Sequence, residues 1–264
     1  MKGFSLGAVW EEMIVFLRRE RALMIPVAFA LLGPAQMLLD LSMTRGMSAP
    51  PTEQTARGEA LLIVPALLLV LLANLTITRL VLVPGISVLE ALADGLRRLP
   101  RTLGTMLLMA GAFVAAALAI LAAGTAGFVV FGSDPRSPAI SGQLLALVTI
   151  PAFVLLVRMM LLIPVLAMEE RGVLDALRRG WALGRGIVLR LAAMLLIVLV
   201  LSMMVQLIEL YVVGSVIQLL ALTTGAGELM KVIHMLINAA IDSLLSLGFA
   251  VYVALAYRAV AENR

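Results

Sequence analysis

Six long runs of apolar residues constrain this chain more than any other feature of its sequence. Four of them, at residues 22–39, 60–78, 102–133 and 137–157, carry no charged side chain, and two carry a single one, Glu209 or Asp242. A helix of about 20 residues crosses the ~30 Å hydrocarbon core of a bilayer, since each residue adds about 1.5 Å. The composition agrees, with 62% apolar and only 14% charged side chains. We therefore predict an all-α polytopic integral membrane protein.

The runs and the charged segments between them predict a single membrane domain with about six transmembrane helices. The fifth run is about 36 residues long and would extend about 54 Å as a straight helix. We expect it to be one long helix that bends or breaks near Gly214, and two separate spans are the alternative. The expected bounds of the six spans are 22–41, 60–83, 102–130, 142–168, 187–222 and 229–258.

Positive charges gather on one side of this predicted topology. Of the 20 Lys and Arg residues, only Arg45, Arg57, Arg136 and Lys231 fall on the side opposite the N-terminus. An excess of cations in short loops marks the cytoplasmic side, so we expect both termini in the cytoplasm. The formal charge of +4 then reflects membrane topology and not nucleic-acid binding. We expect anionic membrane lipids as partners, while protein partners and homo-oligomerisation stay open.

An internal repeat shapes the segments between the spans. The segment beginning at Val9 matches the one beginning at Val88 without a gap, because both read Val-x-Glu and then Leu-Arg-Arg; a third copy begins at Val173, with its two arginines placed earlier. Each copy has apolar residues at helical spacing and a basic end, which is typical of an amphipathic helix in the membrane interface. Such parallel repeats predict three hairpin-like units, with the last span packed beside the first copy.

We refer to these three segments as elbows, and they are expected at residues 5–20, 86–100 and 171–186. They act either as anchors, whose positive charges only hold these segments on the cytoplasmic side, or as structural elements that contact lipid headgroups. Their interfacial basic residues are Arg18, Arg19, Arg97, Arg98, Arg178 and Arg179.

The third elbow carries a family resemblance. Residues 164–169 read Pro-Val-Leu-Ala-Met-Glu, and residues 176–181 read Ala-Leu-Arg-Arg-Gly-Trp. This stretch resembles the membrane domain attached to some glycerophosphoryl diester phosphodiesterases and is similar to related six-span bacterial proteins of unknown function, with Gly180 in place of the usual Ser. In that family the phosphodiesterase activity belongs to a separate soluble domain. The resemblance therefore implies a bacterial inner-membrane module without that activity.

Two arginines lie near the cytoplasmic ends of spans, Arg79 in the second and Arg158 in the fourth. A charged group at the centre of a membrane helix costs at least ~2.5–3.5 kcal/mol, so it needs a partner or water. The planar guanidinium donates two hydrogen bonds to one oxyanion, which makes these residues candidates for binding an anion or a lipid headgroup. Snorkelling of both side chains to the headgroups is the simpler interpretation.

A polar network is expected farther from the cytoplasm. His234, Asn238 and Asp242 are spaced four residues apart and share one helix face, and Glu209 lies on the preceding span. One hypothesis places them in a hydrophilic crevice whose cytoplasmic end carries Arg79 and Arg158. The alternative is structural: Asp242 neutralises one of those arginines, and His234 hydrogen-bonds Glu209 or a loop carbonyl.

Nothing in the sequence indicates catalysis, since it has a single His and no Cys, nucleophile elbow or phosphate-binding loop. No catalytic residue, metal site or cofactor is therefore expected. We favour a non-enzymatic protein of envelope or lipid homeostasis that binds an anionic lipid or a small anion. A secondary transporter or permease component is the alternative, and an intramembrane lipid-modifying enzyme comes third.

Overall fold

The structure is a computed structural model that describes residues 6–48, 53–130, 138–170, 172–184 and 187–262. Six segments within these ranges are helical, long and apolar enough to cross a membrane, which confirms the predicted all-α polytopic architecture. Large apolar side chains such as Leu107 and Leu219 are exposed along the spans, as lipid contact requires. The elements are α1 (Leu6–Ser48), α2 (Glu53–Leu82), α3 (Val88–Val130), α4 (Pro138–Met159), α5 (Leu162–Met168), α6 (Val173–Gly184), α7 (Val188–Ile208), the π-helix η1 (Glu209–Val213), α8 (Gly214–Thr224) and α9 (Gly227–Ala261).

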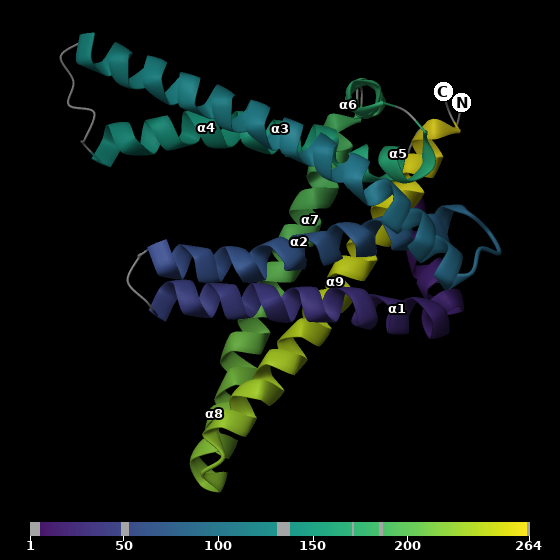
Figure 1. Cartoon of the computed structure of the whole chain (residues 1–264), viewed down its shortest axis with the longest axis vertical. Helices are drawn as coiled ribbons and strands as arrows, with labels where there is room; N and C mark the ends of the chain where they lie inside the picture. Colours follow the sequence, from purple (N-terminus) through teal and green to yellow (C-terminus); the bar gives the residue numbers. More distant parts are fainter. Residues whose placement is uncertain (1–5, 49–52, 131–137, 171, 185–186, 263–264) are drawn as a thin grey trace.

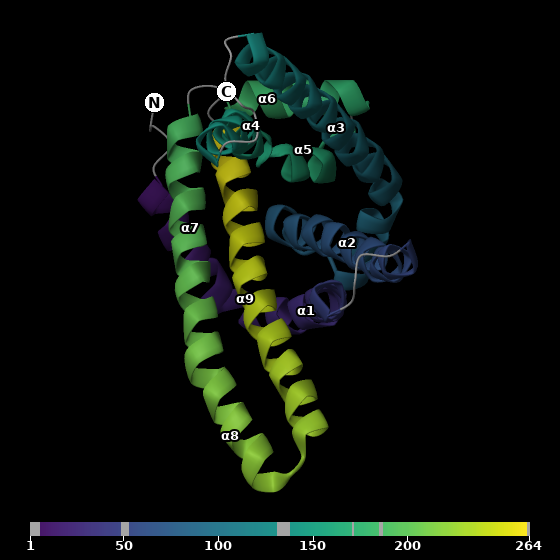
Figure 2. The ribbon, with the colours of Figure 1, turned by 90° about the vertical axis from the view of Figure 1, so that its left-hand side faces the viewer.

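Three helical hairpins extend from a common end of the molecule, which we call the base (Figure 1). They consist of α1 with α2, α3 with α4, and α7 and α8 with α9. The base holds α5, α6, the first turns of α1 and α3, and the last turns of α9. Helix α9 packs along α1 and α2, and the second view shows it running beside α7 and α8 (Figure 2). The last span therefore lies beside the first repeat copy, as the repeat predicts.

Two of the three expected elbows are continuous with the spans that follow them. Helices α1 and α3 each run from the base into the hairpin without a break, through Pro26 and Pro100 respectively. Helix α3 begins sharply, because the Ser87 hydroxyl accepts a hydrogen bond from the Glu90 backbone N–H at 3.3 Å while the Glu90 carboxylate accepts one from the Ser87 N–H at 3.0 Å. Gly85, with φ of 79°, makes the turn before it. Only the third elbow forms a separate helix, α6.

The fourth span is broken, whereas the sequence predicted one continuous segment at 142–168. Helix α4 ends at Met159 and α5 begins at Leu162. Pro164 explains the break, because it has no N–H to donate to the carbonyl of Met160 four residues earlier and its ring would clash with that carbonyl. The chain tightens instead, with the Met160 N–H donating to Val157 O at 3.3 Å. The short helix α5 then lies within the base.

The fifth span keeps one overall path with an irregular turn inside it. The π-helix Glu209–Val213 separates α7 from α8 and ends directly before Gly214, the position where a bend was expected. An ideal Cβ on Gly214 would lie 3.5 Å from the Glu209 carbonyl oxygen and 3.7 Å from Cε1 of His234. Single π turns inside long helices are frequent at functional sites.

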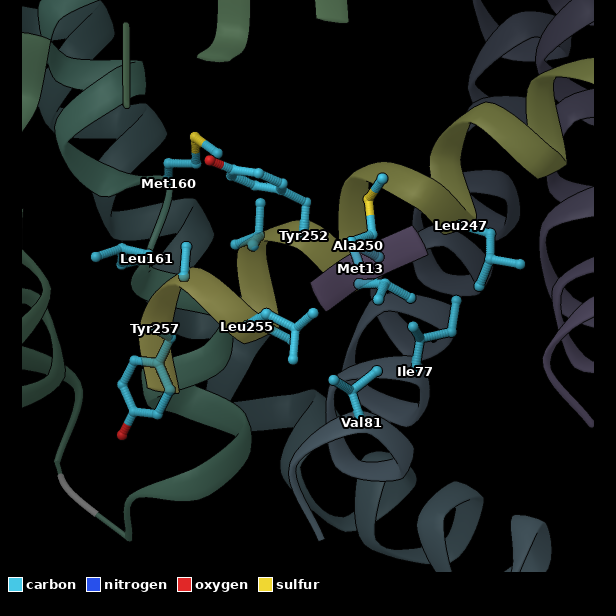
Figure 3. Packing of buried hydrophobic residues seen from close by; sticks show 14 of the residues in the cluster. Met13, Ile77, Val81, Met160, Leu161, Leu247, Ala250, Tyr252, Leu255 and Tyr257 are labelled. Carbon is cyan, nitrogen blue, oxygen red and sulfur yellow. The ribbon is translucent and has the colours of Figure 1, made fainter. Parts of the chain in front are cut away.

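The hydrophobic core surrounds the last three turns of α9. Every residue from Ala250 to Tyr257 is buried. Figure 3 shows this stretch passing between Ile77 and Val81 of α2 on one side and Met160 and Leu161 on the other. By contrast, the described part of the α3 span beyond Met106 has no buried residue. The base is therefore the rigid part of the molecule, and it positions the charged residues described next.

Candidate functional site

Each hairpin returns to the base with an arginine in the last turn of its second helix. Arg79 ends α2, Arg158 ends α4 and Arg258 ends α9. The first two were expected from the sequence, and Arg258 occupies the corresponding place in the third hairpin. Each arginine contacts the repeat copy that follows it around the base: α3 for Arg79, α6 for Arg158 and α1 for Arg258.

Two of these arginines are neutralised by carboxylates. An Nη2 of Arg79 forms an ion pair with Asp94, and an Nη2 of Arg258 forms one with Glu12. The Arg79 side chain is only 15% exposed. Arg79 therefore stabilises the contact between α2 and α3 and carries no uncompensated charge.

Arg158 differs from the other two because no described residue offers it a carboxylate. Its guanidinium carbon lies 3.7 Å from the centroid of the Trp181 ring on α6, within the range of a cation–π interaction. Its Nε, like that of Arg79, is buried without a hydrogen-bond partner in the described structure. Gly184 packs so closely that an ideal Cβ would lie 3.1 Å from the Arg158 carbonyl oxygen. The third repeat copy thus holds an uncompensated cation against an aromatic ring.

A groove of about 400 Å³ lies beside this stacked pair and is lined by Met159, Leu177, Arg178, Trp181 and Ala182. The side chain of Arg178 is 82% exposed, and its ion-pair partner, Asp175, is 3.9 Å away on the same helix. A pair with that exposure is worth under about 1 kcal/mol. The groove therefore combines the guanidinium of Arg178 with apolar residues, and it shares Trp181 with the Arg158 stack.

A second cluster at the base consists of internal contacts around Glu169. The Glu169 carboxylate accepts hydrogen bonds from Arg179 Nε at 3.3 Å and from the Tyr257 hydroxyl at 3.0 Å. An Nη2 of Arg101 donates to the carbonyl oxygens of Leu166 at 2.9 Å and Glu169 at 2.8 Å. These carbonyls belong to the end of α5, where a helix leaves acceptors unpaired. The cluster fixes α5 against α3, α6 and α9.

The expected basic residues of the elbows divide into two groups. Arg98 and Arg179 face the Glu169 cluster, and Arg98 also pairs with Glu170 at 3.2 Å. The other four are exposed on the surface of the base: Arg18, Arg19, Arg97 and Arg178. Only the exposed group is placed to meet lipid headgroups.

Glu209 and His234 face each other across the third hairpin. The Nε2 of His234 lies 3.2 Å from a carboxylate oxygen of Glu209, which is 8% exposed. The π turn that begins at Glu209 displaces the helix register at this point. This contact is one of the two that the structural interpretation offered for His234.

Asn238 lies one turn further along α9 and contacts the first hairpin. Its Nδ2 donates a hydrogen bond to the carboxylate of Asp40 on α1 at 2.8 Å. Asp40 was not among the residues singled out from the sequence. This contact ties α9 to α1 within the spans.

Asp242 lines a crevice of about 520 Å³ bounded by α1, α2, α5, α7 and α9. The described structure gives Asp242 neither an ion pair nor a hydrogen bond, and it contacts neither Arg79 nor Arg158. Of the six residues expected to build a crevice, only Asp242 lines this one. The other polar side chains in its wall are Gln36, Asn74, Ser202, Gln206 and Ser246.

Among the described residues, no group of three or more His, Asp or Glu side chains could hold a metal ion. The comparisons with known proteins add no relative. No protein-family model, curated protein or solved structure matches this chain. The site is therefore interpreted from its geometry alone.

Sequence reasoning missed the acidic partners at the base, chiefly Asp94, Glu12 and Glu169. One signal was present: Glu169 stands within the stretch that resembles the phosphodiesterase membrane domain, directly after the apolar residues of α5. The distances from Arg79 to Asp94 and from Arg258 to Glu12 along the chain are too different to be found by spacing. These pairs follow from how the hairpins meet.

Proposed function

We propose that this chain is a non-enzymatic protein of a bacterial inner membrane that binds an anionic phospholipid headgroup at Arg158. The observation that carries the proposal is the contrast among the three equivalent arginines. Arg79 and Arg258 have carboxylate partners, whereas the described part of the chain gives Arg158 the Trp181 ring and no carboxylate. A partly buried cation without a carboxylate partner among the described residues favours an anion from outside the protein.

The groove beside Arg158 supports a lipid more than a free anion. Arg178 in its wall, and Arg158 stacked on the Trp181 ring that lines it, would offer planar donors to a phosphate. Met159, Leu177 and Trp181 would offer apolar contact to the acyl chain below it. Trp at the membrane interface commonly takes this position, with its ring at the level of the headgroups. An anionic headgroup gains about 1 kcal/mol from each Arg near the surface.

The proposal includes the orientation of the protein. The exposed arginines of the base are the ones that the charge rule places in the cytoplasm, with both termini on that side. The groove would then meet the inner leaflet. A role in envelope or lipid homeostasis, as a module resembling the phosphodiesterase membrane domains, fits a protein that holds a specific lipid there.

Native mass spectrometry of the purified full-length protein tests the proposal. We expect wild-type protein to retain phosphatidylglycerol in preference to phosphatidylcholine, and the double variant Arg158→Gln, Arg178→Gln to lose that preference. Arg97→Gln is the matched control, because it removes an exposed cation of the base away from the groove. Equal loss in the control, or unchanged preference in the double variant, would overturn the proposal.

The crevice at Asp242 favours a second candidate, a secondary transporter or permease component. A polar cavity between helices near the middle of the spans, next to a broken helix, is a common feature of such proteins. In reconstituted vesicles, this candidate predicts that Asp242→Asn removes flux while the folded protein stays in the membrane. Disappearance of the folded variant would show that Asp242 is structural.

A further inference from the structure

We propose that the crevice bounded by α1, α2, α5, α7 and α9 binds a primary ammonium group, with the Asp242 carboxylate as its counter-ion. This site shares no lining residue with the groove beside Arg158. It also takes a ligand of the opposite charge. The two sites can therefore be tested and can fail separately.

His234, Asn238 and Asp242 form a polar stripe on one face of α9. Asp242 is the member of this stripe without a hydrogen bond or ion pair among the described residues. The other two members of the stripe have partners on neighbouring helices: His234 contacts Glu209 at 3.2 Å, and Asn238 donates to Asp40 at 2.8 Å. The described structure gives Asp242 no such contact, although it faces a cavity. A carboxylate at this depth needs a partner, water or a ligand.

The wall of the crevice supplies no positive charge. Its residues include no Lys, Arg or His. The two arginines that the sequence placed at the cytoplasmic end of a crevice contact other groups: Arg79 pairs with Asp94, and Arg158 stacks on Trp181. The charge that would balance Asp242 therefore comes from a bound cation.

Two amide side chains in the wall use their N–H groups for contacts within the protein. The Nδ2 of Asn74 donates to its own helix, to Val70 O at 2.8 Å, and the Nε2 of Gln36 donates to Ser246 Oγ at 3.5 Å. In the described structure no donor contacts their side-chain oxygens, which can therefore accept hydrogen bonds. An ammonium group has three N–H donors and no acceptor, so it matches one carboxylate and two amide oxygens.

The rest of the wall suits a short hydrocarbon attached to the ammonium group. Leu195, Val198 and Phe249 line it together with the polar residues, and its volume of about 520 Å³ exceeds what a bare ion needs. Two sources share this chemistry, the ethanolamine headgroup of a lipid and a free small amine.

The test measures the midpoint of thermal unfolding of the full-length protein in a non-ionic detergent. The probes are ethylammonium chloride against sodium chloride at equal ionic strength, and phosphatidylethanolamine against phosphatidylcholine, whose quaternary nitrogen has no N–H. We expect ethylammonium or phosphatidylethanolamine to raise the wild-type midpoint by a few degrees, since a ligand of the folded state stabilises it. A rise with the lipid alone identifies the headgroup, and a rise with both identifies the ammonium group itself.

Two variants and a control complete the experiment. Asp242→Asn should abolish the rise, while Glu209→Gln, which removes an acid of the spans outside the crevice, should keep it. Ser202→Leu narrows the crevice without changing charge and should also abolish the rise, so it tests the proposal even if Asp242→Asn does not fold. No rise in wild type, an equal rise with sodium chloride or phosphatidylcholine, or an undiminished rise in both crevice variants would overturn the proposal.

Discussion

Arg258, near the end of α9, forms an ion pair with Glu12, near the start of α1, and so joins the two ends of the chain at the base. In the first hairpin the corresponding arginine, Arg79, pairs with Asp94 on the following helix. The pairs link each hairpin to the next copy of the repeat. They differ in burial, and this difference leads to the first prediction.

Loss of the Arg79 pair should cost more stability than loss of the Arg258 pair. Asp94→Asn leaves Arg79, which is mostly buried, without its carboxylate, and breaking a buried pair costs about 3–5 kcal/mol. Glu12→Gln breaks a half-exposed pair, where about 0–1 kcal/mol is expected. Thermal unfolding in detergent, followed by circular dichroism, measures both. A larger drop in the unfolding midpoint for Glu12→Gln would contradict this ranking and show that the Arg258 pair contributes more to stability.

Gly184→Val should destabilise the protein and disturb Arg158. A Cβ at Gly184 already meets the Arg158 carbonyl oxygen at 3.1 Å and its Cγ at 3.2 Å, so two further methyl groups require the helices to separate. Overpacking of this kind typically costs about 1–3 kcal/mol. Binding of phosphatidylglycerol should weaken in the same variant.

Gly111→Ala is the matched control for this substitution. Gly111 lies inside α3 with open space around an added Cβ. The alanine should raise stability by about 0.5–1 kcal/mol, because it loses less conformational entropy than glycine when the helix forms. Destabilisation by Gly111→Ala would mean that the α3 face is covered in the assembled protein.

Arg101→Gln should loosen α5. The guanidinium bridges the carbonyl oxygens of Leu166 and Glu169, and the shorter amide cannot reach both. The two carbonyls then keep only the longer hydrogen bonds from Arg98 Nη1, at 3.4 and 3.5 Å, and each lost hydrogen bond should cost about 1 kcal/mol. Hydrogen exchange across residues 162–169 should rise in this variant and stay unchanged in Arg97→Gln, whose side chain is exposed. Unchanged exchange in Arg101→Gln would contradict the capping role.

His234→Ala should cost more than Glu209→Gln. The alanine leaves the Glu209 carboxylate, which is 8% exposed, without its imidazole partner, at about 1–3 kcal/mol. The glutamine keeps the shape and removes the charge that needs a partner. Unfolding midpoints of the two single variants and the double variant measure the coupling, and additive effects would show that the two side chains act independently.

The sequence pattern predicted the helices well where a single residue determines the local backbone. It missed the break between α4 and α5. One continuous fourth span was expected across Pro164, although its missing N–H ends α4 five residues earlier. The bend expected at Gly214 has a local cause too, and the π turn lies directly before it. The continuity of α1 and α3 was less predictable, because Pro26 and Pro100 are tolerated inside them.

The residues of the candidate site likewise fall into those that a local pattern predicts and those that only tertiary packing brings together. The sequence singled out Arg79, Arg158 and the stripe on α9 because charge inside an apolar run is visible locally. It did not reveal that Asp94 neutralises Arg79 or that Trp181 alone stacks on Arg158. Asp40 and Glu12 were missed for the same reason, since their partners lie about 200 residues or more away in the chain.

By itself, the sequence determined that this chain is a polytopic helical protein with about six spans, because apolar length and helical spacing are properties of single segments. Only the tertiary structure decided which charges are used internally and which remain available. Whether an arginine finds a carboxylate depends on how three hairpins meet at the base, and this packing brings together residues that no local pattern connects. Arg158 and Asp242 are distinguished from their neighbours by that packing alone.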